Sequence, residues 1–212
     1  SGAPVMRPVW YEFPKDELTY LISDEYMVGG DVLVAPIVKQ GTLSREVYLP
    51  AGADWVNWWT GEKFEGGKAQ KVDAPIDRLP IFVRVGAVIP TQAVLQNTTE
   101  MAASPVTLNV VAGIAAGNPE TSVLFEDAGD GYGYRGSDWK EVMIQHSRGS
   151  LKISRTGKFA GQQIRFLEIV GLDARPKAVT AAGKDLAFTF DAAARRVKVE
   201  LSGTETEISL VR

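Results

Sequence analysis

Three carboxylates lie close together in the stretch FEDAGDGYGY: Glu126, Asp127 and Asp130. Clustered acids can transfer protons or bind a divalent cation. The Asp-Gly and Gly-Tyr-Gly steps, however, are typical of a tight turn whose Asp side chains bond to their own backbone. The spacing also lacks the terminal bidentate glutamate of a calcium loop. We therefore predict a structural turn, with neither catalytic nor metal-binding residues here.

The other residue types that carry chemistry are scarce. The chain has no cysteine and one histidine, His146, which excludes disulfides, thiolate metal sites and most multi-histidine metal sites. His146 lies near the end of an alternating apolar run that precedes a turn at Arg148-Gly149. This context favours a structural or surface histidine over a catalytic one, and no cofactor is expected.

Three tryptophans occur within WVNWWTGEKFEGG, where Trp58 and Trp59 are adjacent. On a strand, neighbouring side chains point to opposite faces, so one ring could be buried and the other exposed. Exposed rings can stack on sugars, but large aromatic side chains more often pack in a core or at an interface. We expect Trp58 and Trp59 to be mostly buried, and a sugar platform is the minor alternative.

The elements that must position these residues are short strands. From Asp31 onward, strand signals such as VLVAPIV and SREVYLP alternate with turns, and 21 glycines and 11 prolines interrupt the chain. Of the 212 residues, 45% are apolar and 23% are charged, with a net charge of -3. This composition predicts a globular, soluble, all-β protein without the basic charge of a nucleic-acid binder or an apolar run long enough for a membrane. The compartment stays open.

The first thirty residues differ in kind. PVMRPVWYEFP is apolar and extended, and the segment after it predicts one or two helical turns that end at a glycine pair. Such a strand normally lies inside a covered parallel sheet, yet no companion strands or crossover helices follow. The sequence is thus expected to begin in the middle of a fold.

A second break lies near residues 112–120, AGIAAGNPE, where small residues interrupt the strand pattern. The tail beyond it carries repeated alternating runs, and TFDAAARRVKVEL predicts strand, turn and strand with the turn at 191–194. A second, smaller sandwich is expected here. In DAPIDRLPIFVRVG, the acidic and basic residues predict a turn before a buried strand rather than sugar contacts: Asp73, Asp77, Arg78 and Arg84.

Several stretches in this order together resemble the C-terminal part of family 31 glycoside hydrolases, the α-glucosidase and α-xylosidase group. They span about residues 4–134 and are PVMRPVWYEFP, SDEYMVGGDVLVAPIV, SREVYLP, WWTGEKFEGG, VDAPIDRLPIFVRVGAVIP and FEDAGDGYGY. Each is weak alone, whereas the series is specific.

The resemblance implies a parent enzyme with a (β/α)8 barrel followed by two consecutive antiparallel β-sandwiches. Residues 1–30 would be the last barrel strand and its connection, 31–112 the proximal sandwich and 113–212 the distal one. Members of the family hydrolyse α-linked glucosides or xylosides with retention, using two carboxyl groups on earlier barrel strands. Neither catalytic motif is present here, so this chain is expected to be inactive alone and to brace the barrel.

Two rival hypotheses remain. In one, the chain is a carbohydrate-binding module that holds an α-linked oligosaccharide through exposed aromatic residues, for which the candidates are Trp10, Trp58, Tyr132, Tyr134 and Trp139. In the other, it is an interaction sandwich with no sugar contact. An exposed apolar surface around Val5, Val9 and Trp10 would also favour self-association.

Overall fold

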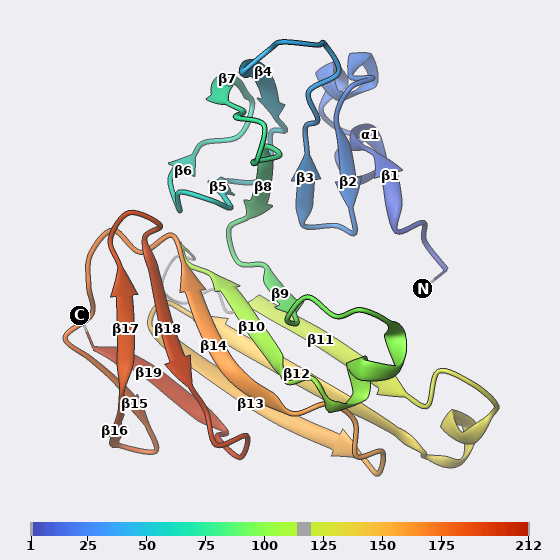
Figure 1. The fold of residues 1–212 in the computed structure, drawn as a ribbon, viewed down its shortest axis with the longest axis vertical. Helices are drawn as coiled ribbons and strands as arrows, with labels where there is room; N and C mark the ends of the chain where they lie inside the picture. The colour runs from blue at the N-terminus through green and yellow to red at the C-terminus, as the bar shows by residue number, and fades with distance from the viewer. Residues whose placement is uncertain (1, 114–119, 212) are drawn as a thin grey trace. The chain divides into compact units, whose positions relative to one another are not determined.

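The computed structural model describes residues 2–113 and 120–211, which form two compact units, Ser1–Val85 and Gly86–Arg212. Strands dominate both units, and the described helical segments are short, with four to six residues each (Figure 1). The predicted all-β class is confirmed. No helix among the described residues is long and apolar enough to cross a membrane.

The first unit contains a six-stranded sheet in the order β1-β2-β3-β8-β5-β6 and a two-stranded ribbon, β4-β7. Its elements are β1 (Met6–Pro8), α1 (Val9–Glu12), the 3-10 helix η1 (Glu17–Leu21), β2 (Tyr26–Val28), β3 (Val32–Val34), β4 (Ser44–Leu49), β5 (Trp55–Asn57), β6 (Lys63–Phe64), β7 (Lys68–Asp73) and β8 (Ile81–Arg84). One core joins sheet and ribbon: Met27, Leu33, Ala35, Val47, Leu49, Trp55, Val72 and Phe82.

The N-terminal segment differs from the expected extended strand. Only Met6–Pro8 is a strand, and Val9–Glu12 forms one helical turn. Pro8 precedes this turn with φ -65° and ψ 153°, and Phe13, which precedes Pro14, leaves the helical region because proline disfavours it in the residue before. The expectation that Val9 is exposed is wrong, because the turn buries its side chain completely.

The glycine pair Gly29-Gly30 lies between two strands rather than at a helix end. It closes the hairpin of β2 and β3, where Gly29 has φ 64°, a conformation that glycine adopts without strain. The Gly29 amide also donates to the carbonyl oxygen of Val5 at 2.8 Å. β1 thus pairs antiparallel with β2 and ends the sheet order, instead of lying among parallel strands.

The second unit layers two sheets over one core (Figure 1). One sheet has the order β17-β18-β14-β10-β9 and the other β11-β12-β13-β19-β15-β16. Its elements are β9 (Val88–Thr91), η2 (Thr98–Ala103), β10 (Val106–Val111), β11 (Glu120–Asp127), η3 (Gly133–Gly136), β12 (Trp139–Ser147), β13 (Ser150–Gly157), β14 (Ile164–Val170), β15 (Ala178–Ala181), β16 (Lys184–Leu186), β17 (Phe188–Asp191), β18 (Arg196–Glu200) and β19 (Glu207–Val211).

Alternation along the strands fills this core. In β12, Val142 and Ile144 are buried, whereas Met143 between them is more exposed, as a strand with one covered face requires. The expected hairpin before His146 is present, since β12 pairs with β13 and turns at residues 148–149. The predicted turn after Phe190 is also confirmed, because the Asp191 carboxylate accepts bonds from the amides of Ala193 and Ala194.

One pairing departs from the expected antiparallel sandwiches: β10 and β14 run parallel, whereas the other pairs of described strands are antiparallel. β9 and β10 pair with each other in the second unit, and the division into two compact units falls between Val85 and Gly86. The expected break at 112–120 falls largely on residues 114–119, which lie outside the described residues.

Candidate functional site

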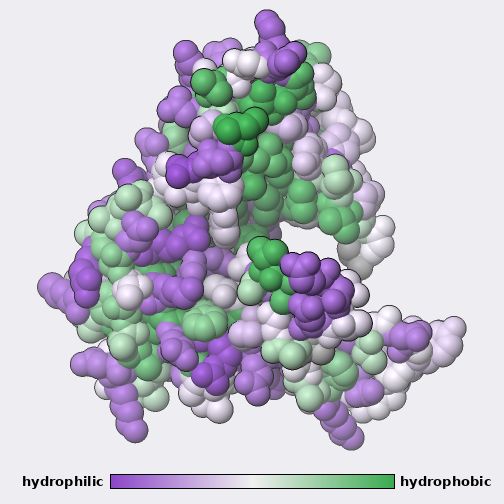
Figure 2. Space-filling model, in the orientation of Figure 1, coloured by the Kyte–Doolittle hydropathy of each residue, from purple (hydrophilic) through white to green (hydrophobic). Residues whose placement is uncertain are grey.

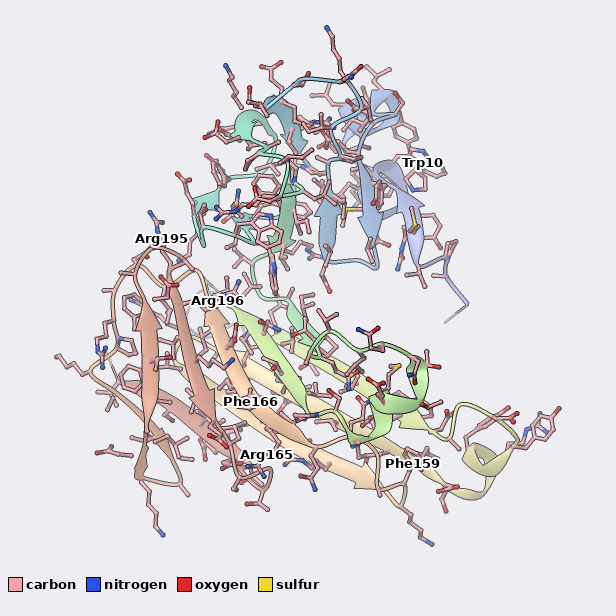
Figure 3. All side chains as sticks on the ribbon, viewed as in Figure 1. Trp10, Phe159, Arg165, Phe166, Arg195 and Arg196 are labelled. Atoms are coloured by element: carbon pink, nitrogen blue, oxygen red, sulfur yellow. The ribbon has the colours of Figure 1, made fainter. Side chains whose placement is uncertain are left out.

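An apolar surface covers the start of the first unit. We define the N-terminal apolar face by its exposed members, Val5, Met6, Trp10, Tyr11, Leu18, Tyr20 and Leu21. Trp10, labelled in Figure 3, stacks on Tyr20, with ring centroids 5.9 Å apart and an interplanar angle of 7°. The Arg7 guanidinium lies 5.3 Å from the Tyr11 ring and pairs with Glu12. Hydrophobic side chains also reach the surface of the first unit in Figure 2. Large exposed apolar side chains gathered on one segment are typical of interaction sites.

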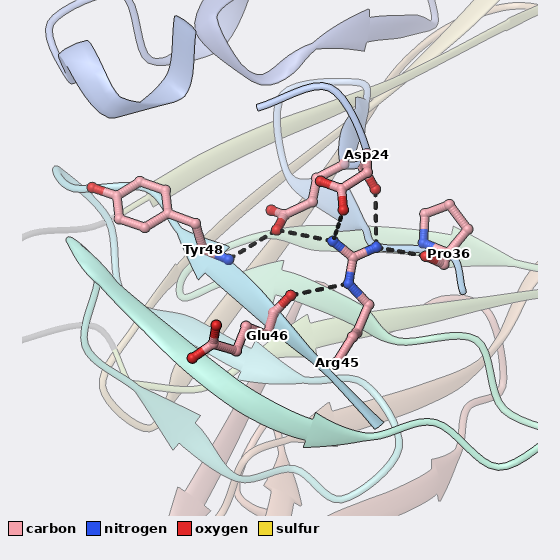
Figure 4. A network of polar contacts seen from close by, with 6 residues as sticks. Asp24, Pro36, Arg45, Glu46 and Tyr48 are labelled. Atoms are coloured by element: carbon pink, nitrogen blue, oxygen red, sulfur yellow. Dashed lines mark hydrogen bonds and ion pairs between the residues drawn. The ribbon is translucent and has the colours of Figure 1, made fainter. Parts of the chain in front are cut away.

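Glu25, which follows the N-terminal apolar face in the sequence, carries a buried carboxyl group. Glu25 Oε1 accepts a bond from the Tyr48 amide at 2.9 Å and lies 3.5 Å from Arg45 Nη2 (Figure 4). Its other oxygen is buried without a hydrogen-bond partner among the described residues. Burial raises the pKa of Glu25 to about 7, against the opposing effects of the Tyr48 amide and the Arg45 charge.

Arg45 holds this region together. Its guanidinium bonds to the Asp24 carboxylate at 2.8 Å and to the carbonyl oxygens of Asp24 and Pro36 (Figure 4). Nearby, the Tyr48 hydroxyl donates to Asp16 at 2.8 Å, the acid that also caps η1. These bonds fasten residues 16–25 to β4. They position the N-terminal apolar face, and the described residues of this network do not place two carboxyls around an open site.

The tryptophan motif is divided differently from the prediction. Trp55 is the fully buried ring and its Nε1 donates to the Pro50 carbonyl oxygen at 3.1 Å. Trp58 is half-buried and Trp59 is 39% exposed, with its Nε1 bonded to the Leu79 carbonyl oxygen. The expectation that Trp58 and Trp59 fill the core is therefore wrong for Trp59. The Asn57 side chain accepts the Trp59 amide and starts a turn that carries this ring outward.

The acid turn forms as predicted. Asp127 accepts the Gly129 amide at 2.8 Å, and Asp130 accepts the Gly131 amide at 2.7 Å. Glu126 instead forms an ion pair with Lys140 at 2.5 Å and accepts the Gln162 amide. Among the described residues, no three acids or histidines gather as a metal site would require. These bonds support the structural role.

The remaining candidate aromatic residues lie around the hairpin of β11 and β12. Tyr132 and Tyr134 are exposed in its loop, where Arg135 lies over both rings, 4.6 Å and 5.8 Å from their centroids. Trp139 begins β12 and stacks with Phe125 at 6.2 Å. The sequence reasoning missed Phe125, although the alternation Val123, Phe125, Asp127 was a signal for an outward face.

His146 is structural. It is buried on β12, and its Nε2 lies 2.8 Å from the Gly86 carbonyl oxygen. Burial lowers the pKa of His146, against the opposing effects of that hydrogen bond and of Glu120. The neutral ring therefore ties the first residue of the second unit to β12. The predicted turn at Asp77-Arg78 is also present, with the Arg78 amide bonded to the Pro75 carbonyl oxygen.

Comparison with known proteins gives a consistent result. The family described as "Glycosyl hydrolase family 31 C-terminal domain" matches residues 2–89. Alpha-glucosidase 2 of Bacillus thermoamyloliquefaciens is 38% identical over 161 residues, which are 76% of this chain and 20% of that protein. The chain belongs to the C-terminal region of glycoside hydrolase family 31. An alpha-xylosidase of Saccharolobus solfataricus is 33% identical over 73% of this chain and 22% of its own length.

A solved family 31 structure extends the match to the second unit. The Flavobacterium johnsoniae dextranase, in complex with glucose, aligns over 100% of this chain and 29% of its own, with a TM-score of 0.85 and 27% identity. This family 31 chain therefore spans less than a third of each of these relatives. The fold predicted from the sequence motifs, the β-sandwich fold of family 31 C-terminal domains, is confirmed.

Proposed function

We propose that this chain is the accessory C-terminal region of a retaining α-glucosidase-like hydrolase, where it braces a catalytic (β/α)8 barrel earlier in the same polypeptide. Residues 1–30 would end that barrel, and the catalytic carboxylates would lie upstream. The observation that carries the proposal is the N-terminal apolar face, which lies on residues that match the family. A relative named as an alpha-xylosidase leaves an α-xylosidase parent as the alternative.

The contacts in the first unit support a bracing role. Trp10, Tyr20 and Leu21 expose apolar area that would be removed from water by a covering domain. The bonds from Arg45 and Tyr48 hold the segment behind this face on the ribbon of β4 and β7, so the face is presented on a fixed support. Without a covering domain, the same face favours self-association.

The first experiment compares the 212-residue chain with a longer polypeptide that includes the upstream region. Nitrophenyl α-glucoside and nitrophenyl α-xyloside are the substrates. We expect turnover by the longer polypeptide alone, because retaining hydrolysis needs a nucleophile and a proton donor on either side of one bond. Turnover by the 212-residue chain that is lost on mutating Asp127 or Asp130 would contradict the proposal.

The second experiment tests the face itself in the longer polypeptide. Leu21→Ser should lower the melting temperature and the activity together, because it places a hydroxyl in a covered apolar contact. Val94→Ser is the matched control, since Val94 is 97% exposed and lies in the second unit. Equal behaviour of the two variants would show that the face is not covered.

A carbohydrate-binding module is the second candidate function. Exposed aromatic residues support it, Tyr132 and Trp10 among them. Trp58 is the weakest candidate, because its side chain is half-buried. Weak retention of the 212-residue chain on an α-glucan would favour this function and is compatible with the bracing role.

A further inference from the structure

The outward face of the hairpin β11–β12 carries a pair of aromatic rings. Phe125 and Trp139 stack with an interplanar angle of 22°, and they lie on adjacent strands, where Asp127 is the residue directly opposite Trp139. Phe125 is 52% exposed, and Val123 beside it is 55% exposed. The side chains of Val142 and Ile144 already fill the core on the opposite face. The rings of Phe125 and Trp139 are therefore not part of the hydrophobic core.

Polar side chains share this outward face. Glu141 lies directly opposite Phe125 on β12, and Thr156 lies opposite Glu141 on β13, so these residues form one row across three strands. Glu141 makes no ion pair within the part of the chain that the structure describes. Its carboxylate is therefore available to accept hydrogen bonds beside the rings. We call Val123, Phe125, Trp139, Glu141 and Thr156 the hairpin face.

The loop of the same hairpin adds two more rings at the end of this face. Tyr132 and Tyr134 are exposed, and Arg135 orders them by lying over both. The loop itself is braced by the bonds of Asp127 and Asp130 to their own backbone. Four aromatic rings and several hydrogen-bonding groups therefore lie on or beside one hairpin.

The combination of aromatic rings, a carboxylate and a hydroxyl on the hairpin face favours a sugar over a protein as its ligand. The buried centre of a protein interface is depleted of charged residues, whereas the hairpin face has an unpaired carboxylate between its rings and a hydroxyl. A sugar has apolar faces that pack on aromatic rings and hydroxyls that donate to carboxylates. We propose that the hairpin face, with the loop tyrosines, binds an α-linked glucan chain. The choice of an α-linked glucan depends on the proposed function, because the parent would act on such bonds.

Affinity gel electrophoresis of the 212-residue chain tests the proposal. Gels contain dextran, soluble starch or a β-linked glucan, and a gel without polysaccharide gives the reference mobility. We expect retardation by dextran or starch only, and its loss in Phe125→Ala and Trp139→Ala. Phe166→Ala is the matched control, because Phe166 is a half-buried phenylalanine on β14 in the other sheet of the same unit (Figure 3). It should keep full retardation.

Several results would overturn the proposal. They are no retardation by any α-linked glucan, equal retardation by the β-linked glucan, or retardation that Phe125→Ala and Trp139→Ala leave intact. Dimerisation that depends on Phe125, seen by size-exclusion chromatography, would instead identify the face as an interface between copies. If either variant does not fold by circular dichroism, Tyr132→Ala carries the test, since that ring is 71% exposed, and it should weaken retardation.

The design separates this proposal from the bracing function. The longer polypeptide is assayed on a nitrophenyl glycoside, which is too small to need a second contact. If it is active and the hairpin face does not bind glucan, only the present proposal fails. If it has no α-glycosidase activity but the 212-residue chain is retarded through Phe125, the bracing function fails and the hairpin site stands as a binding module.

Discussion

Replacing Glu25 by glutamine should change how the stability of the first unit depends on pH. The pKa of Glu25 is raised from 4.5 to about 7, so the native state holds this proton more tightly than the unfolded chain does. Its contribution to the free energy of unfolding is therefore fully present below pH 4.5 and is lost as the pH rises through 7. Since one pKa unit corresponds to about 1.4 kcal/mol, the loss amounts to about 3 kcal/mol.

Urea unfolding followed by tryptophan fluorescence measures this effect in the first unit, which contains Glu25. Trp10, Trp55, Trp58 and Trp59, four of the 5 tryptophans, lie in the first unit. Between about pH 4 and about pH 8, Glu25→Gln should gain about 3 kcal/mol relative to the unsubstituted chain, because its amide cannot ionise. Tyr48→Phe is the control, since it removes the bond to Asp16 but keeps Glu25. Parallel pH profiles for Glu25→Gln and the unsubstituted chain would refute the reasoning.

Three further predictions concern packing, backbone strain and metal. Trp55→Ala should lower the free energy of unfolding by about 3–5 kcal/mol in urea, whereas Trp59→Ala should cost about 1 kcal/mol, the value of one hydrogen bond; similar costs would contradict the burial difference. Gly157→Ala should destabilise the second unit by more than about 1 kcal/mol, because a Cβ would lie 1.9 Å from the Trp139 carbonyl oxygen at φ 95°. Gly183→Ala, with φ 78° and nothing within 4 Å, should cost less in the same thermal melts. Chelator should leave the melting temperature unchanged, and a rise that scales with added calcium would show that the acid turn binds the ion.

The sequence predicted those elements that are determined by residues close to one another in the chain. Alternation in β12 and the glycine and aspartate turns are encoded within a few residues, so the all-β class and the acid turn followed from the sequence. The motif series did the same for the family, because six stretches in one order are far more specific than any one of them.

The rest depends on contacts between distant residues. Nothing local marks Glu25 as buried, because its partners Arg45 and Tyr48 lie on β4, 20 and 23 positions away in the sequence. Trp55 and Trp59 are equivalent by residue type, and the Asn57 turn decides which one is buried. The parallel pairing of β10 with β14 is likewise invisible to alternation, since a strand with apolar residues on one face fits either direction.

That parallel pair has a consequence for the order of folding. β10 and β14 can meet only after the intervening residues 112–163, with β11, β12 and β13, have left the ribosome, and β18 must follow to cover β14. The described strands of the first unit, β1 to β8, pair with one another within Ser1–Val85. Contacts that close long loops form slowly. During synthesis the first unit therefore has time to fold before β14 is made. Until then the edge of β10 that later pairs with β14 is unpaired, so the β9–β10 pair is exposed to incorrect pairing for longer than any earlier strand.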